Sequence, residues 1–98
     1  MCGIIGIIGN KKNLGANLLE GIKRLEYRGY DSVGMATLNK GKIEIRKDVG
    51  EVEKVNKKVN FKEMKGQLGM AHSRWATCGG VTKENAHPHQ SCNGNITM

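Results

Sequence analysis

The chain has 98 residues, which is near the lower limit for a self-sufficient core, so it encodes at most one domain or a part of one. Hydrophobic residues make up 38% and charged residues 26% of the sequence, which excludes a disordered chain and predicts a packed fold. The net charge of +7 comes from lysines spread along the whole chain, and aromatic residues amount to only 4%, which argues against a nucleic-acid interface.

Residues 3–9 are glycine and isoleucine, and this β-branched run predicts a buried strand with Cys2 at its start. The run is too short to span a membrane and lacks the basic leader of a secretory signal, so we expect no membrane association and a cytoplasmic chain. Asn13 then offers a helix cap. The apolar residues that follow at helical spacing, which predict a helix ending near residues 27–29, are Leu14, Leu18, Ile22 and Leu25.

Residues 33–38 and 42–46 are β-prone and are joined by a short glycine-containing loop, which predicts a β-hairpin. The spacing of Val52, Val55 and Val59 indicates a second helix, and residues 67–72 indicate another strand. This order of elements is typical of an α/β or α+β layered domain. Residues 94–98 read as a turn that enters a further strand, so we expect the chain to stop inside its domain.

Cys2 becomes the N-terminal residue if Met1 is trimmed, and it then carries a thiol and an α-amino group together. The α-amino group has a reference pKa of about 8, so it can accept the thiol proton without the help of a histidine. The thiolate could attack a carboxamide and form a thioester through an oxyanion intermediate. The alternative is a small apolar residue that simply begins a buried strand.

The other cysteines suggest no disulfide framework, because the total of three is odd and no export signal is present. A zinc site is an alternative, since four residues of suitable type lie within fifteen positions. These are Cys78, His87, His89 and Cys92. Their spacing fits no standard zinc motif, so we predict no metal and no cofactor.

Three further segments, together with the initial Met-Cys-Gly-Ile, narrow the choice of family. They are residues 25–34 (LEYRGYDSVG), 71–77 (AHSRWAT) and 85–89 (NAHPH). In these motifs the chain resembles, over essentially all 98 residues, the glutaminase domain of the glutamine:fructose-6-phosphate amidotransferase family. Met-Cys-Gly-Ile alone is shared with other class II amidotransferases, so the glutaminase domain of one of those stays an alternative.

The resemblance implies an α+β fold, the N-terminal-nucleophile (Ntn) hydrolase four-layer αββα sandwich, here truncated. Residues 1–98 would be a partial type 2 glutamine amidotransferase domain, with the rest of that domain and the sugar isomerase domains absent. The implied activity is hydrolysis of glutamine to glutamate and ammonia on Cys2. The ammonia would convert fructose 6-phosphate to glucosamine 6-phosphate in the isomerase domain. A homo-oligomer is left open for the full-length protein.

The resemblance also implies roles for single residues. Arg74 matches the arginine that binds the α-carboxylate of glutamine, a task for which a planar guanidinium is suited. Trp75 matches a residue in the loop over the bound amino acid, Thr77 lies near the same carboxylate, and His87 matches a histidine lining the pocket. Arg28 and Asp31 are expected to support the site structurally. Each of these residue types is also common in purely structural roles.

Two departures from the family pattern stand out. Cys78 occupies a substrate-binding position where the resemblance leads us to expect histidine, which is tolerable only if that position acts through its backbone. The His-Asn-Gly motif that forms the family's oxyanion hole, and the pocket aspartate, would follow Met98. We therefore expect little glutaminase activity from these residues by themselves. A noncatalytic or split fragment that needs the remaining part is the corresponding alternative.

Overall fold

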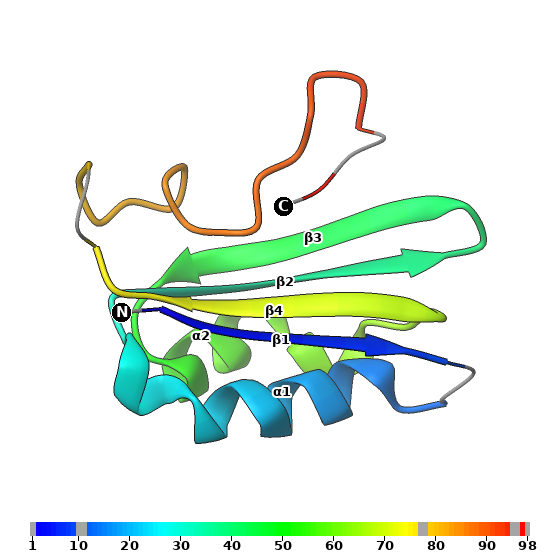
Figure 1. Ribbon diagram of the computed structural model, residues 1–98, viewed down its shortest axis with the longest axis horizontal. Coiled ribbons are helices and arrows are strands. Elements are labelled where there is room, and N and C mark those ends of the chain that lie inside the picture. The colour runs from blue at the N-terminus through cyan, green and yellow to red at the C-terminus, as the bar shows by residue number, and fades with distance from the viewer. Residues whose placement is uncertain (1, 10–11, 77–78, 95–96, 98) are drawn as a thin grey trace.

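The computed structural model describes residues 2–9, 12–76, 79–94 and 97. Its regular elements are β1 (Gly3–Ile8), α1 (Leu14–Arg24), η1 (Glu26–Arg28), β2 (Ser32–Asn39), β3 (Lys42–Val49), α2 (Val52–Val59), η2 (Phe61–Glu63) and β4 (Leu68–Arg74). The four strands form one antiparallel sheet in the order β1-β4-β2-β3. Both helices lie on the same face of this sheet (Figure 1). The predicted α+β layering is confirmed.

The hairpin of β2 and β3 forms as the sequence predicted, although β3 continues to Val49 rather than ending at residue 46. Its two loop residues, Lys40 and Gly41, have φ values of 51° and 77°. Positive φ at both loop positions is the geometry that matches the right-handed twist of the flanking strands. Glycine in this loop is therefore needed for its backbone conformation.

The hydrophobic core lies between α1 and the sheet. Leu14, Leu18 and Ile22 are fully buried, as their helical spacing predicted. The other buried members of the core are Leu19, Val33, Met35, Val52, Val55, Phe61, Met64 and Ala71. In β2, alternate side chains enter this core, so the residues between them, such as Gly34, face the other side of the sheet.

Asn13 precedes α1 as expected, but its side chain makes no capping hydrogen bond. Its backbone carbonyl instead accepts a hydrogen bond from Asn17 N at 2.9 Å. The helix ends at Arg24, and η1 extends the helical path to Arg28, which accounts for the predicted end near residues 27–29. The position of the helix was therefore correct and the proposed cap contact was wrong.

The prediction that residues 3–9 form a buried strand holds for only one face of β1. Ile4 and Ile8 are 63% and 84% exposed, whereas Ile5 and Ile7 pack against the core cluster. β1 is an edge strand, and its alternating side chains meet helices on only one face of the sheet. We call the face of the sheet that carries Ile4 and Ile8, opposite the helices, the open face.

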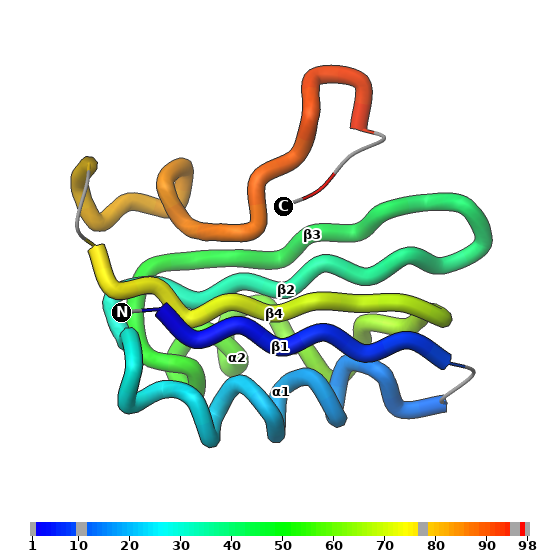
Figure 2. The backbone as a smooth tube through the Cα atoms, in the orientation of Figure 1, coloured from blue at the N-terminus to red at the C-terminus, as the bar shows by residue number. Residues whose placement is uncertain are grey.

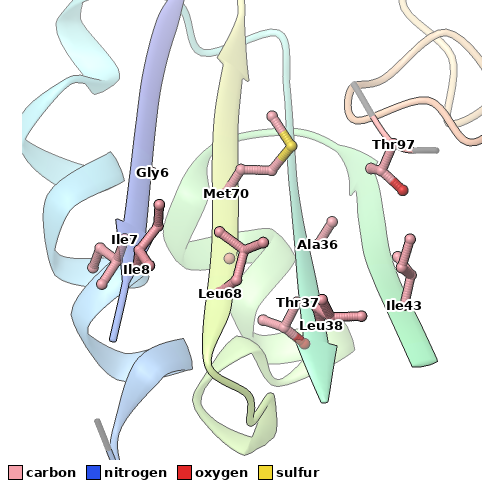
Figure 3. Close-up of a pocket in the computed structure, with 11 residues that line it drawn as sticks. Gly6, Ile7, Ile8, Ala36, Thr37, Leu38, Ile43, Leu68, Met70 and Thr97 are labelled. Carbon is pink, nitrogen blue, oxygen red and sulfur yellow. The ribbon is translucent and has the colours of Figure 1, made fainter. Parts of the chain in front are cut away.

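The far end of this open face contains an apolar hollow of about 660 Å³ (Figure 3). Its lining residues are Gly6, Ile7, Ile8, Ala36, Thr37, Leu38, Ile43, Leu68, Gly69, Met70 and Thr97. Leu68 begins β4, whereas Arg74 ends it, so the hollow lies at the opposite end of the strand from Cys2 and the Arg-Trp motif. Apolar lining without titratable groups makes it a packing surface rather than a reaction centre.

Residues 79–94 form an irregular segment above the open face, on the opposite side of the sheet from the helices (Figures 1 and 2). Ala86 and Pro88 are buried against the sheet. A turn forms at residues 91–94, where Gly94 N donates to Ser91 O at 2.9 Å, just before the turn predicted for residues 94–98. The strand expected to follow lies largely outside the described residues. Among the described residues, no helix has the length and apolar character to cross a membrane.

Candidate active site

Cys2 lies at the start of β1, beside the end of β4. Gly3 pairs with Ser73, so the antiparallel register brings Cys2 next to the residues that follow Ser73. The backbone N–H of Trp75 donates to Cys2 Sγ at 3.3 Å, and the thiol is 3.8 Å from the Trp75 carbonyl oxygen. The cysteine is half-buried and carries a free thiol. The sulfur is thus held in place and remains accessible to a small molecule. Met1, whose removal is predicted, lies outside the described residues.

Gly3 follows the cysteine because no larger residue fits there. A Cβ at this position would lie 2.7 Å from Ser73 Oγ and 2.8 Å from Leu25 Cβ. Both distances are shorter than real Cβ contacts, so a side chain would push β1 away from α1 and β4. Glycine at position 3 therefore allows Cys2 to approach the end of β4.

Asp31 holds the Arg74–Ala76 turn from both sides. Its backbone N–H donates to Arg74 O at 3.0 Å, and its carboxylate Oδ2 accepts from Ala76 N at 2.8 Å. The peptide between these contacts belongs to Trp75, whose N–H points at Cys2. The two bonds of Asp31 determine the direction of the Trp75 N–H group that contacts Cys2 Sγ.

Gly29 allows the same turn to pack closely on the residues after α1. A Cβ at Gly29 would lie 2.6 Å from the carbonyl carbon of Arg74 and 2.7 Å from Trp75 N. The φ angle of Gly29 is −174°, which any residue can adopt, so the requirement for glycine is steric. The glycine of the Tyr-Arg-Gly-Tyr-Asp run thus serves the site through close backbone packing.

Arg74 is the last residue of β4, and it is only 7% exposed. Its Nη1 donates to Gly80 O at 3.0 Å, and Asn85 Nδ2 donates to the same oxygen at 3.1 Å. Arg74 therefore links the sheet to the start of the 79–94 segment. A buried guanidinium beside a half-buried cysteine gives this end of the sheet both a cation and a nucleophile.

The Trp75 side chain is 45% exposed, and its ring meets the Tyr30 ring edge-on, with centroids 6.1 Å apart. Tyr30 is itself exposed. Exposed aromatic rings beside a nucleophile are suited to covering a bound ligand. Tyr30 was not among the predicted site residues, although it lies in the Tyr-Arg-Gly-Tyr-Asp motif that indicated the family.

His87 lies over the sheet and contacts another histidine that the sequence analysis did not select. The His87 and His72 rings are 4.4 Å apart and tilted by 34°, and the His87 and His89 rings are also 4.4 Å apart. His72 lies on β4, two residues before Arg74, so the Ala-His-Ser-Arg-Trp motif already contained this residue. The three imidazoles form a cluster near Arg74, with His72 and His87 tilted to each other and His89 edge-on to His87.

The surroundings of His72 and His87 disfavour the charged form of both rings. Burial, followed by the charges of His87, Arg74 and His89, lowers the pKa of His72 to about 4. Burial also lowers the pKa of His87, with smaller contributions from His89, Arg74 and Lys47. His72 is only 8% exposed, and its Nδ1 has no hydrogen-bond partner among the described residues. Near neutral pH, His72 therefore adds a polar surface to the site without adding charge.

Thr77 and Cys78, two of the predicted substrate-binding residues, lie outside the described residues. The zinc alternative involved Cys78 as well. In the described ranges, no group of three or more His, Cys, Asp or Glu side chains is arranged to hold a metal ion. Cys92, another member of that alternative, is an exposed free cysteine.

No protein-family model matches the chain. Over all 98 residues it is 57% identical to the glutamine–fructose-6-phosphate aminotransferase (isomerizing) of Methanococcus maripaludis and 52% identical to that of Pyrococcus horikoshii. A bacterial relative of the same name, from Pseudomonas putida, is 50% identical over 94 residues. The chain spans 16% of the length of each of the two archaeal relatives.

Solved structures of similar fold include the glutamine phosphoribosylpyrophosphate amidotransferase of B. subtilis, complexed with ADP and GMP. The TM-score is 0.77 at 24% identity, and the match covers 95% of this chain and 20% of that chain. A structure described as the allosteric regulatory enzyme of purine biosynthesis gives a TM-score of 0.78 at 26% identity, with the same coverage. The predicted Ntn amidotransferase fold class is confirmed.

Proposed function

Because the chain is related over its whole length to part of the glutamine–fructose-6-phosphate aminotransferases and has an Ntn amidotransferase fold, we propose that it supplies the glutaminase nucleophile of such an enzyme. The observation that carries the proposal is the position of Cys2. Its sulfur lies 3.3 Å from the Trp75 amide, at the strand end that also bears Arg74. A thiol, a guanidinium and exposed aromatic rings are the groups that an amino-acid hydrolase of this kind needs.

In the proposed reaction, the α-amino group of Cys2 takes the thiol proton after removal of Met1. The sulfur attacks the carboxamide carbon of glutamine, the α-ammonium group returns its proton to the amide nitrogen, and the tetrahedral oxyanion collapses to the thioester as the C–N bond breaks and ammonia leaves. Water then hydrolyses the thioester, releasing glutamate and restoring the thiol. The whole sequence consumes one water per glutamine and needs no metal or redox partner.

Arg74 is proposed to bind the α-carboxylate of glutamine, as the resemblance implies. A guanidinium has five N–H donors in a planar fork, so one arginine can brace a loop carbonyl and bind a carboxylate as well. Trp75 would cover the bound amino acid, and His87 would line its pocket. Thr77 and Cys78 keep their proposed substrate-binding roles from the resemblance alone.

A test of this proposal compares glutamate release by the full product of the gene that encodes this chain with release by its C2A variant. We expect C2A to lower the rate more than about a thousandfold, because it removes the attacking atom. C92A is the matched control, since Cys92 is a free thiol that is also exposed. Full activity in C2A, or intact-mass evidence that Met1 remains on the active protein, would contradict the proposed nucleophile.

We further propose that the ammonia is delivered to fructose 6-phosphate, giving glucosamine 6-phosphate. The relatives with 47–57% identity are named glutamine–fructose-6-phosphate aminotransferases, whereas the two solved structures of similar fold share only 24–26% identity with the chain and support the fold. Supplying the full gene product with glutamine and fructose 6-phosphate should yield the amino sugar phosphate. A glutaminase of another class would release glutamate without this product, and a noncatalytic fragment would release neither. The cytoplasmic location and a homo-oligomeric assembly stay predictions.

A further inference from the structure

One row of side chains crosses three strands beneath the 79–94 segment. Gly34 of β2 pairs with Lys47 of β3 on one side and with His72 of β4 on the other. Paired residues of neighbouring strands point to the same face of a sheet, so Lys47 and His72 flank a gap above Gly34. We call these three residues the cradle.

The backbone of His87 fills the gap in the cradle. A Cβ at Gly34 would collide with the carbonyl oxygen of His87 and would lie 2.7 Å from Lys47 Cβ. The neighbours of His87 in the chain, Ala86 and Pro88, are both buried. The absence of a side chain at Gly34 is therefore what lets this part of the segment rest on the sheet.

Lys47 forms hydrogen bonds to the 79–94 segment on both sides of His87. Its Nζ donates to Ala86 O at 2.7 Å and to Pro88 O at 3.1 Å. Hydrogen bonds from a charged donor are about twice as strong as neutral ones, and two bonds from one ammonium fix the direction of the intervening residue. On the other side of the cradle, the His87 ring packs on His72 at 4.4 Å.

The burial of Lys47 distinguishes it from the exposed lysines that give the chain its basic surface. Burial lowers the pKa of Lys47, and the nearby Glu84 partly offsets this effect. Removing an ammonium group from water costs free energy unless protein groups replace the lost hydrogen bonds. The carbonyl oxygens of Ala86 and Pro88 replace them for Lys47. Lys42, on the same strand, is exposed and illustrates the ordinary case.

We propose that Lys47 is a positioning residue of the glutamine site, which seats residues 86–88 in the cradle and thereby sets the position of His87. The inference rests on the proposed function, because it assigns His87 to the glutamine pocket. Lys47 itself touches neither the nucleophile nor the substrate. Its effect is on the pocket wall, so it should act on glutamine binding more than on the chemical step.

The test uses the full gene product and the variants K47M, K47R and K42M. K47M keeps the length of the side chain but removes the ammonium. We expect K47M to raise the KM for glutamine about tenfold with less than a twofold change in kcat. K47R should restore most of the affinity, because its guanidinium can donate to both carbonyls, and K42M should match the wild type.

An NMR measurement without glutamine tests whether Lys47 holds residues 86–88 in the cradle. In the wild type, nuclear Overhauser contacts between the imidazole protons of His72 and His87 should be present, and in K47M they should be lost or weakened. The pKa of His87 should rise in K47M, since burial and the nearby positive charges of Arg74 and Lys47 hold it down. A well-dispersed amide spectrum would show that the variant is folded.

The outcomes separate the two proposals. Unchanged ring contacts and an unchanged His87 titration in K47M would overturn the seating role. Lost ring contacts with an unchanged KM would overturn the link to glutamine while leaving the glutaminase assignment intact. A wild-type protein that does not hydrolyse glutamine would overturn the proposed function and the glutamine part of this inference, and the NMR result would still decide the seating.

Discussion

The carboxylate of Asp31 provides the most direct way to disturb the surroundings of Cys2, the proposed nucleophile, without changing Cys2 itself. Its Oδ2 accepts the Ala76 N–H at 2.8 Å, while the Asp31 backbone N–H donates to Arg74 O. The substitution D31A removes only the first of these bonds. The turn should then relax, and the Trp75 N–H should move away from Cys2 Sγ.

The expected magnitude follows from the type of bond. A hydrogen bond to a charged group contributes about 1.5–3 kcal/mol, and Asp31 is half-buried, so we expect a loss near the lower end of this range. A small domain is typically stable by about 5–15 kcal/mol, so D31A should remain folded. Urea unfolding at neutral pH measures the change in the free energy of unfolding.

Amide hydrogen exchange locates the effect. The Ala76 and Trp75 amides should lose protection in D31A, whereas amides in the β2–β3 hairpin should not change. D48A is a suitable control, because Asp48 Oδ1 also accepts a backbone N–H, from Val49 at 2.7 Å, at a position away from Cys2. If D31A and D48A had equal stability and the Ala76 amide stayed protected, Asp31 could not be the residue that holds the turn.

Two further predictions concern packing and pH. G29A should destabilise the fold by about 1–3 kcal/mol, because its Cβ would lie 2.6 Å from the carbonyl carbon of Arg74. G6A, whose Cβ would meet nothing closer than Gly69 O at 3.8 Å, should change the stability far less, and equal urea midpoints would refute the steric argument. His72 has a pKa of about 4 in the folded state against 6.5 for the unfolded chain, so the unfolded state binds more protons between these values. Its contribution to stability is therefore complete above about pH 6.5 and is lost as the pH falls to about 4. Urea unfolding at pH 7.5 and 4.5 should show a loss of about 2.5 kcal/mol from His72, which the variant H72Q should not show. An equal pH dependence in H72Q would contradict that assignment.

Local features of the fold could be predicted from the sequence, because they depend on neighbouring residues. The hairpin follows from the Asn39-Lys40-Gly41 loop between two β-prone runs, and α1 follows from leucine and isoleucine at helical spacing. The exposure of Ile4 and Ile8 could not be predicted in the same way. It depends on β1 being an edge strand with helices on only one side, which is a property of the whole sheet.

The residues that touch the candidate site were predictable only where a family motif marked them. Cys2, Arg74 and Trp75 were selected in this way, and their proximity then follows from the pairing of Gly3 with Ser73. Lys47 was not selected, because its partners Ala86 and Pro88 are distant in the sequence and because the chain contains many other lysines. His72 was overlooked because a histidine inside a strand gives no sign of what covers it.

The alternating side-chain direction along β4 explains why the open face is apolar at one end and polar at the other. Leu68, Met70, His72 and Arg74 are spaced by two, so all four point to the open face. The first pair lines the apolar hollow, whereas His72 contacts His87 and Arg74 binds Gly80 of the 79–94 segment. A one-residue shift of β4 against both β1 and β2 would send His72 and Arg74 into the hydrophobic core and separate Cys2 from Trp75. The strand pairing that buries the core therefore also places Cys2 beside Trp75. A change that weakens the pairing of β4 should destabilise the fold and disrupt the candidate site together.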